Sequence, residues 1–405
     1  MPHSARRAWA LSLAVCLAVT LTLGGCASGG ASPGASGAAE TTSQAQSPAT
    51  TLVDDFCNPD LGCGWESTGQ LELAYAKRLC VYTYEGGYRL ACLADGSRYL
   101  VVPEGAQVPA GLAGDIVTIQ RPMGDVYLAA SDSMCLFQAL GQLDRITVSG
   151  IARDDWQIPA ARDAMDAGRI VYGGKYRAPD YELLLDRGVR LAMESTMINH
   201  VPEVREKLVE LGIPVLTELS SYEEEPLGRA EWIKLVGVLC DCEDEAQRLF
   251  DEQVAQVAGI RKPDTGKTVA FFYLNANGAA VVRRPGDYVT KMIEQAGGTY
   301  AFDDLDPATP GASSVTLEME QFFSVAKEAD VMVYNATIDD GVDSLADLTR
   351  KNGLLEDCAA VRAKEVYVTD SSMYQQMLES GSMIADLNRM LCGEGDDLTF
   401  LRRLS

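Results

Sequence analysis

The chain has 405 residues, of which 47% are hydrophobic, and its 34 basic and 58 acidic residues give a formal charge of −24 at pH 7. This length suits about two globular domains, and the acidic excess argues against a nucleic-acid partner, which requires clustered Lys and Arg. The sequence holds two histidines, and His3 lies in a segment that we expect to be removed, which leaves His200. A metal site built from several histidines is therefore improbable, and a HExxH metalloprotease is excluded.

The first residues have the order of a secretory signal. Arg6 and Arg7 precede an uncharged apolar run over residues 8–23, which approaches the length of a membrane span, so a retained anchor is the alternative. Leu-Gly-Gly-Cys at residues 23–26 resembles the bacterial lipobox, which implies that Cys26 is diacylated and becomes the mature N-terminus. We therefore expect residues 1–25 to be a lipoprotein signal peptide, with the protein held by two acyl chains on the extracytoplasmic face of the cell membrane.

Residues 26–55 consist largely of Ala, Ser, Gly, Thr, Gln and Pro. Such a composition buries too little apolar surface to offset chain entropy, which predicts a flexible tether with the folded part beginning near Phe56. Nine cysteines follow Cys26, an odd number for an oxidising compartment. Pairing is left open, with Cys57–Cys63 and Cys80–Cys92 as candidates, the latter because the two residues flank a Gly-Gly turn. The remaining cysteines are Cys135, Cys240, Cys242, Cys358 and Cys392.

Alternating polarity and β-branched residues predict strands over residues 79–102. Short apolar runs then alternate with stretches of helical spacing, with the runs at residues 126–129, 146–148, 170–172, 191–193 and 213–216. After residue 263 the alternation restarts, with strands expected at residues 269–274, 331–334 and 366–368. Strands that alternate with helices indicate a mainly parallel sheet covered on both faces.

Between these two α/β regions, residues 226–260 repeat apolar positions every three or four residues, with an interruption at Cys240–Cys242. We therefore predict an α/β protein of two lobes, each with a central, mainly parallel sheet flanked by helices. The predicted boundaries are 56–242 for the N-terminal lobe, 243–262 for one long connecting helix and 263–405 for the C-terminal lobe.

Two motifs resemble chemical sites but have simpler interpretations. Thr-Gly-Lys-Thr at residues 265–268 ends like a phosphate-binding loop, but it lacks the first glycine and precedes a strand instead of following one. The acidic run at residues 223–225 stands before Pro226, where negative charge is favoured at a helix start, so we expect it to cap a helix.

Several segments resemble the iron-complex and vitamin B12 type substrate-binding lipoproteins of ABC importers. They are residues 133–141, 178–184, 194–197, 211–215, 222–239 and 293–298, in this order behind the lipobox. The resemblance implies a non-enzymatic receptor of two lobes that close on a ligand, with an ABC permease as its partner. It also implies that Glu182 and Glu294, one on each lobe, dock onto permease arginines.

Ligands of open α/β sheets bind beyond the carboxyl ends of the strands. This rule gives a set of predicted ligand-binding residues: Ser131, Trp156, Tyr176, Arg177, Ser195, Thr196, Tyr222, Arg283, Arg284, Asn335 and Tyr374. Arginine forms bidentate bonds to carboxylate or catecholate oxygens, and the aromatic rings can stack on a planar ligand. No catalytic residue, protein metal ligand or cofactor is expected.

The sequence therefore favours a lipid-anchored receptor for an iron chelate, most simply a ferric siderophore, whose iron is held by the chelator. Haem is an alternative because Met197 and His200 lie near a predicted cleft loop, and a corrinoid is another. A surface α/β hydrolase and an adhesion lipoprotein are disfavoured, because no nucleophile, base and orienting group occur together and because two linked lobes suit ligand capture.

Overall fold

The computed structural model describes residues 50–260, 264–305 and 313–405. The predicted signal peptide, Cys26 and the tether up to residue 49 lie outside these ranges. Residues 50–55, which we expected to belong to the tether, instead contact the folded part. The Val53 N–H donates to the Ala94 carbonyl at 2.7 Å, and the Asn199 amide donates to the Thr50 hydroxyl at 2.7 Å. None of the helices in the described ranges is long and apolar enough to span a membrane.

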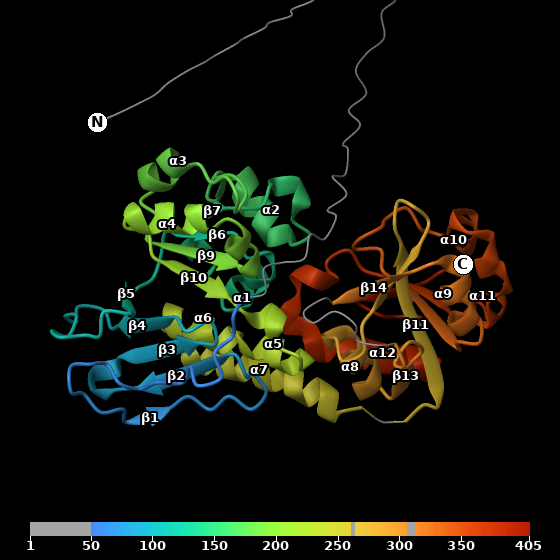
Figure 1. The fold of residues 1–405 in the computed structure, drawn as a ribbon, viewed down its shortest axis with the longest axis horizontal. Coiled ribbons are helices and arrows are strands. Elements are labelled where there is room, and N and C mark those ends of the chain that lie inside the picture. Colours follow the sequence, from blue (N-terminus) through green and yellow to red (C-terminus); the bar gives the residue numbers. More distant parts are fainter. Residues whose placement is uncertain (1–49, 261–263, 306–312) are drawn as a thin grey trace, which may run out of the picture. The chain divides into compact units, whose positions relative to one another are not determined.

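The first sheet, sheet A, precedes the predicted parallel sheets (Figure 1). Its strands, in spatial order, are β1 (Gly69–Gln70), β2 (Leu79–Thr83), β3 (Arg89–Leu93), β4 (Arg98–Val102) and β5 (Ile116–Gln120), antiparallel except for the parallel pair β4–β5. Side chains alternate between two apolar clusters, so that Leu79 and Val81 face one cluster and Cys80 the other. Sheet A therefore has a core on each face.

The disulfide in this region differs from both predicted pairs. Cys80 and Cys92 do lie opposite each other on β2 and β3, but Cys80 bonds to Cys57. The segment that carries Cys57 crosses this pair, because the Cys92 thiol donates to the Asn58 carbonyl at 3.4 Å. Cys57 therefore reaches Cys80 directly, and Cys63 and Cys92 remain thiols.

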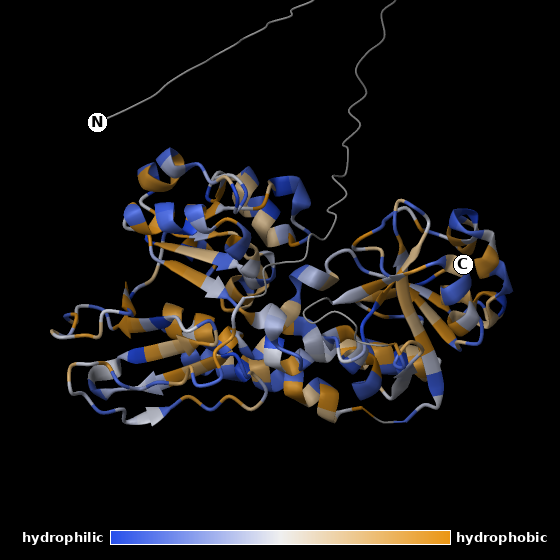
Figure 2. Cartoon of the chain, viewed as in Figure 1, coloured by the Kyte–Doolittle hydropathy of each residue, from blue (hydrophilic) through white to orange (hydrophobic). Residues whose placement is uncertain are grey.

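Sheet B of the first lobe is fully parallel, in the order β10-β9-β6-β7-β8. Its strands are β6 (Val126–Leu128), β7 (Ile146–Ser149), β8 (Val171–Tyr172), β9 (Leu191–Ser195) and β10 (Val215–Glu218), and its helices are α1 (Met134–Ala139), α2 (Pro159–Asp166), α3 (Tyr181–Asp186) and α4 (Pro202–Glu210). Helices α3 and α4 pack on one face through Leu184, Val204 and Leu208, and α1 packs on the other. Hydrophobic residues follow the strands, while α4 is largely hydrophilic (Figure 2).

Sheet C of the second lobe has the order β14-β12-β11-β15-β16-β17, with β13 also paired to β11. Its strands are β11 (Lys267–Leu274), β12 (Ala280–Arg283), β13 (Gly298–Tyr300), β14 (Ser314–Leu317), β15 (Val331–Tyr334), β16 (Val366–Thr369) and β17 (Leu401–Arg403), and its helices are α8 (Tyr288–Gln295), α9 (Met319–Ala326), α10 (Leu345–Lys351), α11 (Ala359–Ala363) and α12 (Ser380–Leu391). The central strands are parallel, as predicted, and antiparallel strands flank them, an arrangement common in doubly wound sheets. The predicted α/β class with helix-flanked parallel sheets is confirmed.

Three helices follow sheet B and precede sheet C along the chain: α5 (Pro226–Glu231), α6 (Ile233–Cys240) and α7 (Glu243–Ala258). Helix α7 has 16 residues, about 24 Å, and ends before the predicted limit at residue 262. It packs on α12 at Gly381, where a Cβ would stand 2.2 Å from the Gln253 carbonyl oxygen, so only glycine permits this approach.

Two buried carboxylates attach sheet A to α5. Glu231 accepts backbone N–H bonds from residues 74, 75 and 76 at 2.8–3.0 Å and a bond from Lys234 at 2.9 Å. Glu223 accepts from the N–H groups of residues 77 and 78 at 2.8 and 2.9 Å, and from the Trp232 indole. Glu223 therefore binds the chain before β2 and does not cap a helix, which corrects the interpretation from the sequence.

Glu231→Gln should destabilise the protein by about 3–5 kcal/mol, because it leaves the buried Lys234 ammonium without its anion and turns an amide N–H₂ toward backbone donors. Urea unfolding measures this loss. Glu252→Gln is the control, since Glu252 forms an exposed pair with Arg248 on α7. Equal stability of the two variants would contradict the role of Glu231.

Glu194 on β9 gives a second stability prediction. It is fully buried, and neither carboxylate oxygen has a hydrogen-bond partner among the described residues. Burial raises the pKa of Glu194 to about 8, against an opposing effect of Arg205. Between pH 4.5 and 8 the folded state therefore holds a proton that the unfolded state has lost, so stability falls as the pH rises.

Glu194→Gln removes this titration. Relative to the wild type, the variant should gain about 1.4 kcal/mol of unfolding free energy for each pH unit across that window. Chemical unfolding at several pH values measures the difference, with the exposed Glu206→Gln on α4 as the control. A constant difference between Glu194→Gln and the wild type would refute the assignment.

Candidate functional site

Three predicted ligand-binding residues of the second lobe meet at one hydroxyl. Arg283 ends β12, Asn335 follows β15, and Tyr374 lies on the 3₁₀ helix η8 (Met373–Gln375) after β16. The Tyr374 hydroxyl accepts a hydrogen bond from Arg283 Nη2 and another from Asn335 Nδ2, the latter at 2.8 Å. The Arg283 guanidinium also lies 5.3 Å from the centroid of the Tyr374 ring. The sequence rule therefore selected residues that the fold brings together.

This arrangement defines the chemistry that the hydroxyl offers. A phenol oxygen has two lone pairs and one proton, and the two donors occupy the lone pairs. The Tyr374 proton is therefore directed away from Arg283 and Asn335, toward any acceptor presented to this surface. Arg283 is also 3.7 Å from Asp287, longer than a hydrogen bond, so its charge is only loosely paired. The cluster thus presents a hydroxyl donor and a guanidinium, which suits anionic oxygens.

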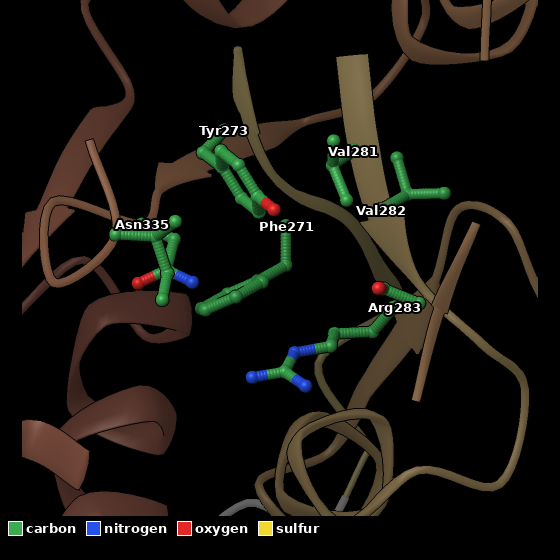
Figure 3. Close-up of a pocket in the computed structure, with 8 residues that line it drawn as sticks. Phe271, Tyr273, Val281, Val282, Arg283 and Asn335 are labelled. Atoms are coloured by element: carbon green, nitrogen blue, oxygen red, sulfur yellow. The ribbon is translucent and has the colours of Figure 1, made fainter. Parts of the chain in front are cut away.

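A cavity of about 40 Å³ adjoins this cluster, and its lining includes Phe271, Tyr273, Arg283, Asn335 and Ile338. Figure 3 shows Arg283 reaching from its strand toward the side of the cavity where Asn335 lies. A water molecule takes roughly 30 Å³ of liquid volume, whereas pockets for organic ligands measure about 300–1,000 Å³. A chelate is therefore too large for this cavity as it stands, and it would bind between Arg283 and Asn335 only if the surrounding loops moved apart.

Residues of both lobes meet next to this cluster. Arg229 of α5 stacks over the ring of Tyr288, the first residue of α8, at 4.2 Å, and Arg283 lies 5.9 Å from the same ring. Burial raises the pKa of Tyr288, so the phenol stays neutral between the two cations. The Tyr288 ring therefore contacts two guanidinium groups, one from each lobe.

Arg229 is the first member of a series of neighbouring polar and acidic groups in the first lobe. Its Nη2 lies 3.7 Å from Asp132 Oδ2, and Asp132 is 3.4 Å from the Ser220 hydroxyl. The Ser220 N–H donates to the buried Glu218 carboxylate at 2.6 Å. Burial and the nearby Asp132 raise the pKa of Glu218 to about 8, so this carboxyl is mostly neutral at pH 7. The first-lobe side of the candidate site therefore carries less negative charge than its number of acidic residues implies.

Besides Asn335, two predicted site residues are buried. Trp156 is 0% exposed, and its indole donates to the Ser149 hydroxyl at 3.2 Å, so its ring belongs to the core and cannot stack on a ligand in this structure. Arg284 is also buried, and it is absent from the described lining of the cavity beside Arg283. Its neighbour Arg283 supplies the guanidinium at this place.

Four other predicted residues lie at or just after the carboxyl ends of first-lobe strands. Tyr176 and the exposed Arg177 follow β8, the edge strand of sheet B, and Tyr176 packs against the apolar cluster under α3 and α4. Ser195 accepts from the Met197 N–H at 3.4 Å and thereby caps the 3₁₀ helix η5 (Thr196–His200), which begins at Thr196. These residues do not contribute to the Tyr374 cluster through any described hydrogen bond.

The other predicted first-lobe positions lie on the loops after β6, β9 and β10. Tyr222 is half-buried, and its hydroxyl lies 3.1 Å from the Thr50 hydroxyl. Ser131 begins a 3₁₀ helix, η2 (Ser131–Ser133), that packs against η8 of the second lobe. Met197 is 40% exposed and His200 is half-buried, both on η5.

The two predicted docking glutamates are both exposed. Glu182 lies in the first turn of α3, where the Asp180 side chain accepts from the Leu183 N–H at 3.0 Å, and Glu294 lies on α8. Across the residues that the structure describes, no group of three or more His, Cys, Asp or Glu side chains could hold a metal ion.

Sequence reasoning did not single out Asp132, Glu218, Arg229 or Tyr288. Asp132 and Tyr288 lie on loops that the strand-end rule selects, so a search for charged and aromatic side chains on those loops would have found them. Arg229 lies inside α5, where helical spacing gives no sign that its guanidinium stacks on another lobe.

Comparisons with known proteins agree with this architecture. The chain is 25% identical over 346 residues to an uncharacterized lipoprotein of Methanocaldococcus jannaschii, covering 79% of this chain and 81% of that protein. Its fold is similar to the periplasmic heme binding protein HutB of Vibrio cholerae, with a TM-score of 0.52, 19% identity and coverage of 65% and 97% of the two chains. A periplasmic heme binding protein of Pseudomonas aeruginosa gives a TM-score of 0.53, 16% identity and coverage of 69% and 97%.

The family model described as "Periplasmic binding protein" matches residues 129–373, more than half of the chain. Members of this family bind solutes and are not enzymes. The match begins in the loop after β6 and therefore leaves sheet A outside it. The chain thus belongs to the periplasmic binding protein family, and the cluster around Tyr374 is its candidate solute-binding site.

Proposed function

We propose that this protein is a lipid-anchored receptor on the extracytoplasmic face of the cell membrane that captures an anionic iron chelate, a ferric siderophore, and delivers it to an ABC importer permease. The observation that carries the proposal is the convergence of Arg283, Asn335 and Tyr374 on one hydroxyl, next to Arg229 and Tyr288. Guanidinium and phenol donors match catecholate and carboxylate oxygens, and the tyrosine rings match a planar chelate. The lipoprotein relative and the lipobox support the anchor.

Haem is the second candidate of the same class. The similar solved structures of Vibrio cholerae and Pseudomonas aeruginosa are described as heme binding proteins. In this chain, the partly exposed Met197 and His200 of η5 are the side chains that could ligate haem iron. A corrinoid would use the same cleft. Each candidate has a visible absorption band, so one titration compares them.

Binding is measured by quenching of tryptophan fluorescence in the full lipoprotein in detergent, titrated with ferric catecholate and ferric hydroxamate siderophores, haem and cobalamin. Arg283→Gln and Tyr374→Phe should each weaken ferric siderophore binding about tenfold or more, because each removes a charge-assisted or hydroxyl donor. The controls are the exposed Arg350→Gln on α10 and Tyr172→Phe on β8. If none of the compounds binds the wild type, the receptor proposal is wrong.

Delivery to a permease gives a separate prediction. Replacing Glu182 and Glu294 by arginine should abolish uptake by whole cells, because each change puts a cation opposite a permease arginine. Chelate affinity of the purified double variant should stay at the wild-type value, since both side chains are exposed and outside the Tyr374 cluster. Wild-type uptake by the double variant would refute docking through these residues.

A further inference from the structure

One side-chain amide joins the two lobes next to the candidate site. Gln375 Oε1 accepts from the Gln157 backbone N–H at 2.7 Å, and Gln375 Nε2 donates to the Asp155 backbone carbonyl at 2.9 Å. Both groups belong to the first-lobe segment that runs from the last residue of the 3₁₀ helix η4 (Arg153–Asp155) toward α2. The amide therefore pairs with a donor and an acceptor of the same backbone segment, as an adjacent strand would.

Side chains on both lobes support this contact. The Ser371 hydroxyl donates to Gln157 Oε1 at 3.2 Å, and Arg162 Nη2 of α2 donates to the same oxygen at 3.2 Å. Arg162 thus fixes the Gln157 side chain from within the first lobe, while Ser371 and Gln375 hold it from the second. We name the Gln375, Ser371 and Gln157 contacts the interlobe clasp.

The clasp is directly continuous with the candidate solute site. Gln375 follows Tyr374 in the same single-turn 3₁₀ helix η8, and Tyr374 receives the bonds from Arg283 and Asn335. A ligand oxygen that takes over either of these donors changes what holds the Tyr374 side chain. Because adjacent residues of one turn move together, such a change reaches the Gln375 amide.

We propose that Gln375 is a positioning residue that holds the first-lobe loop against the second lobe next to the solute site and couples the occupation of Tyr374 to this contact between the lobes. A chelate enters only when the loops around the cavity of about 40 Å³ move apart, so the clasp limits entry and, once re-formed, limits release. The coupling to a chelate rests on the proposed function, whereas the clasp itself does not.

The first test needs no ligand. Hydrogen exchange of the full lipoprotein in detergent is followed by mass spectrometry in peptides that contain the Gln157 amide. Gln375→Ala should raise exchange at Gln157 about tenfold, because this N–H loses its acceptor. Gln376→Ala is the matched control, because Gln376 is adjacent but makes no described side-chain bond to the first lobe. Exchange in Gln375→Ala equal to that in Gln376→Ala would overturn the proposal.

The second test uses stopped-flow fluorescence with whichever ferric siderophore binds the wild type. Gln375→Ala should raise both the association and the dissociation rate about three- to tenfold, while the melting temperature stays near the wild-type value. A lower melting temperature with unchanged rates would mean a purely structural role and would overturn the proposal. If no chelate binds the wild type, the proposed function fails, and hydrogen exchange still decides whether the clasp exists.

Discussion

Capture of five consecutive backbone N–H groups by two buried carboxylates fixes the region between the lobes. Residues 74–78 donate to Glu231 and Glu223, which lie on α5 and just before it. A buried carboxylate is tolerated only with enough donors, and the backbone of the preceding chain supplies them here. On the opposite side, Lys291 of α8 pairs with Glu225 at 2.8 Å. Helix α5 is therefore held by sheet A and by the second lobe, and Arg229 is directed onto Tyr288.

This constraint explains why sheet A is part of the folded protein although the family match starts after it. Its strands share an apolar cluster with α6 and with the first strand of sheet B. Arg121, just after β5, pairs with Asp241 and Glu243 at the break between α6 and α7. Asp241 has a positive φ of 62° at that break. The extra sheet thus supports both the start and the bend of the helices that connect the lobes.

The features that could be predicted from the sequence are those that depend on the local pattern of residues. Strand and helix alternation and the break at Cys240–Cys242 follow from residue spacing and polarity, whereas Glu182 and Glu294 were selected only through the family resemblance. The strand-end rule selected Arg283, Asn335 and Tyr374, which the fold brings into contact, because the rule concerns backbone topology. It placed Trp156 at the ligand because an aromatic residue in a cleft loop has the same sequence signal whether its ring faces solvent or, as here, Ser149.

Contacts between residues far apart in the chain could not be predicted from the sequence, for a physical reason. Cys57 bonds to Cys80 because the segment around Asn58 crosses the hairpin, and neither residue spacing nor the turn encodes that crossing. The same holds for residues 74–76 and Glu231, which are 155–157 positions apart and meet only when sheet A packs on α5. Glu223 looked like a helix cap because its local context fits one equally well.

The charges around Arg229 and Arg283 set the conditions under which a solute could bind beside these two residues. Arg229 and Arg283 each have a carboxylate at 3.7 Å, a distance at which the ion pair lacks a direct hydrogen bond. An incoming anionic oxygen that bonds directly to either guanidinium therefore replaces a weak pairing with a stronger one and leaves Asp132 or Asp287 to be compensated. On the first-lobe side, the neutral Glu218 beside Asp132 lowers that cost, because Asp132 faces a carboxylic acid and not a second full negative charge. The arrangement favours an anion that brings several oxygens at once, since a single one would gain one bond and still displace a carboxylate.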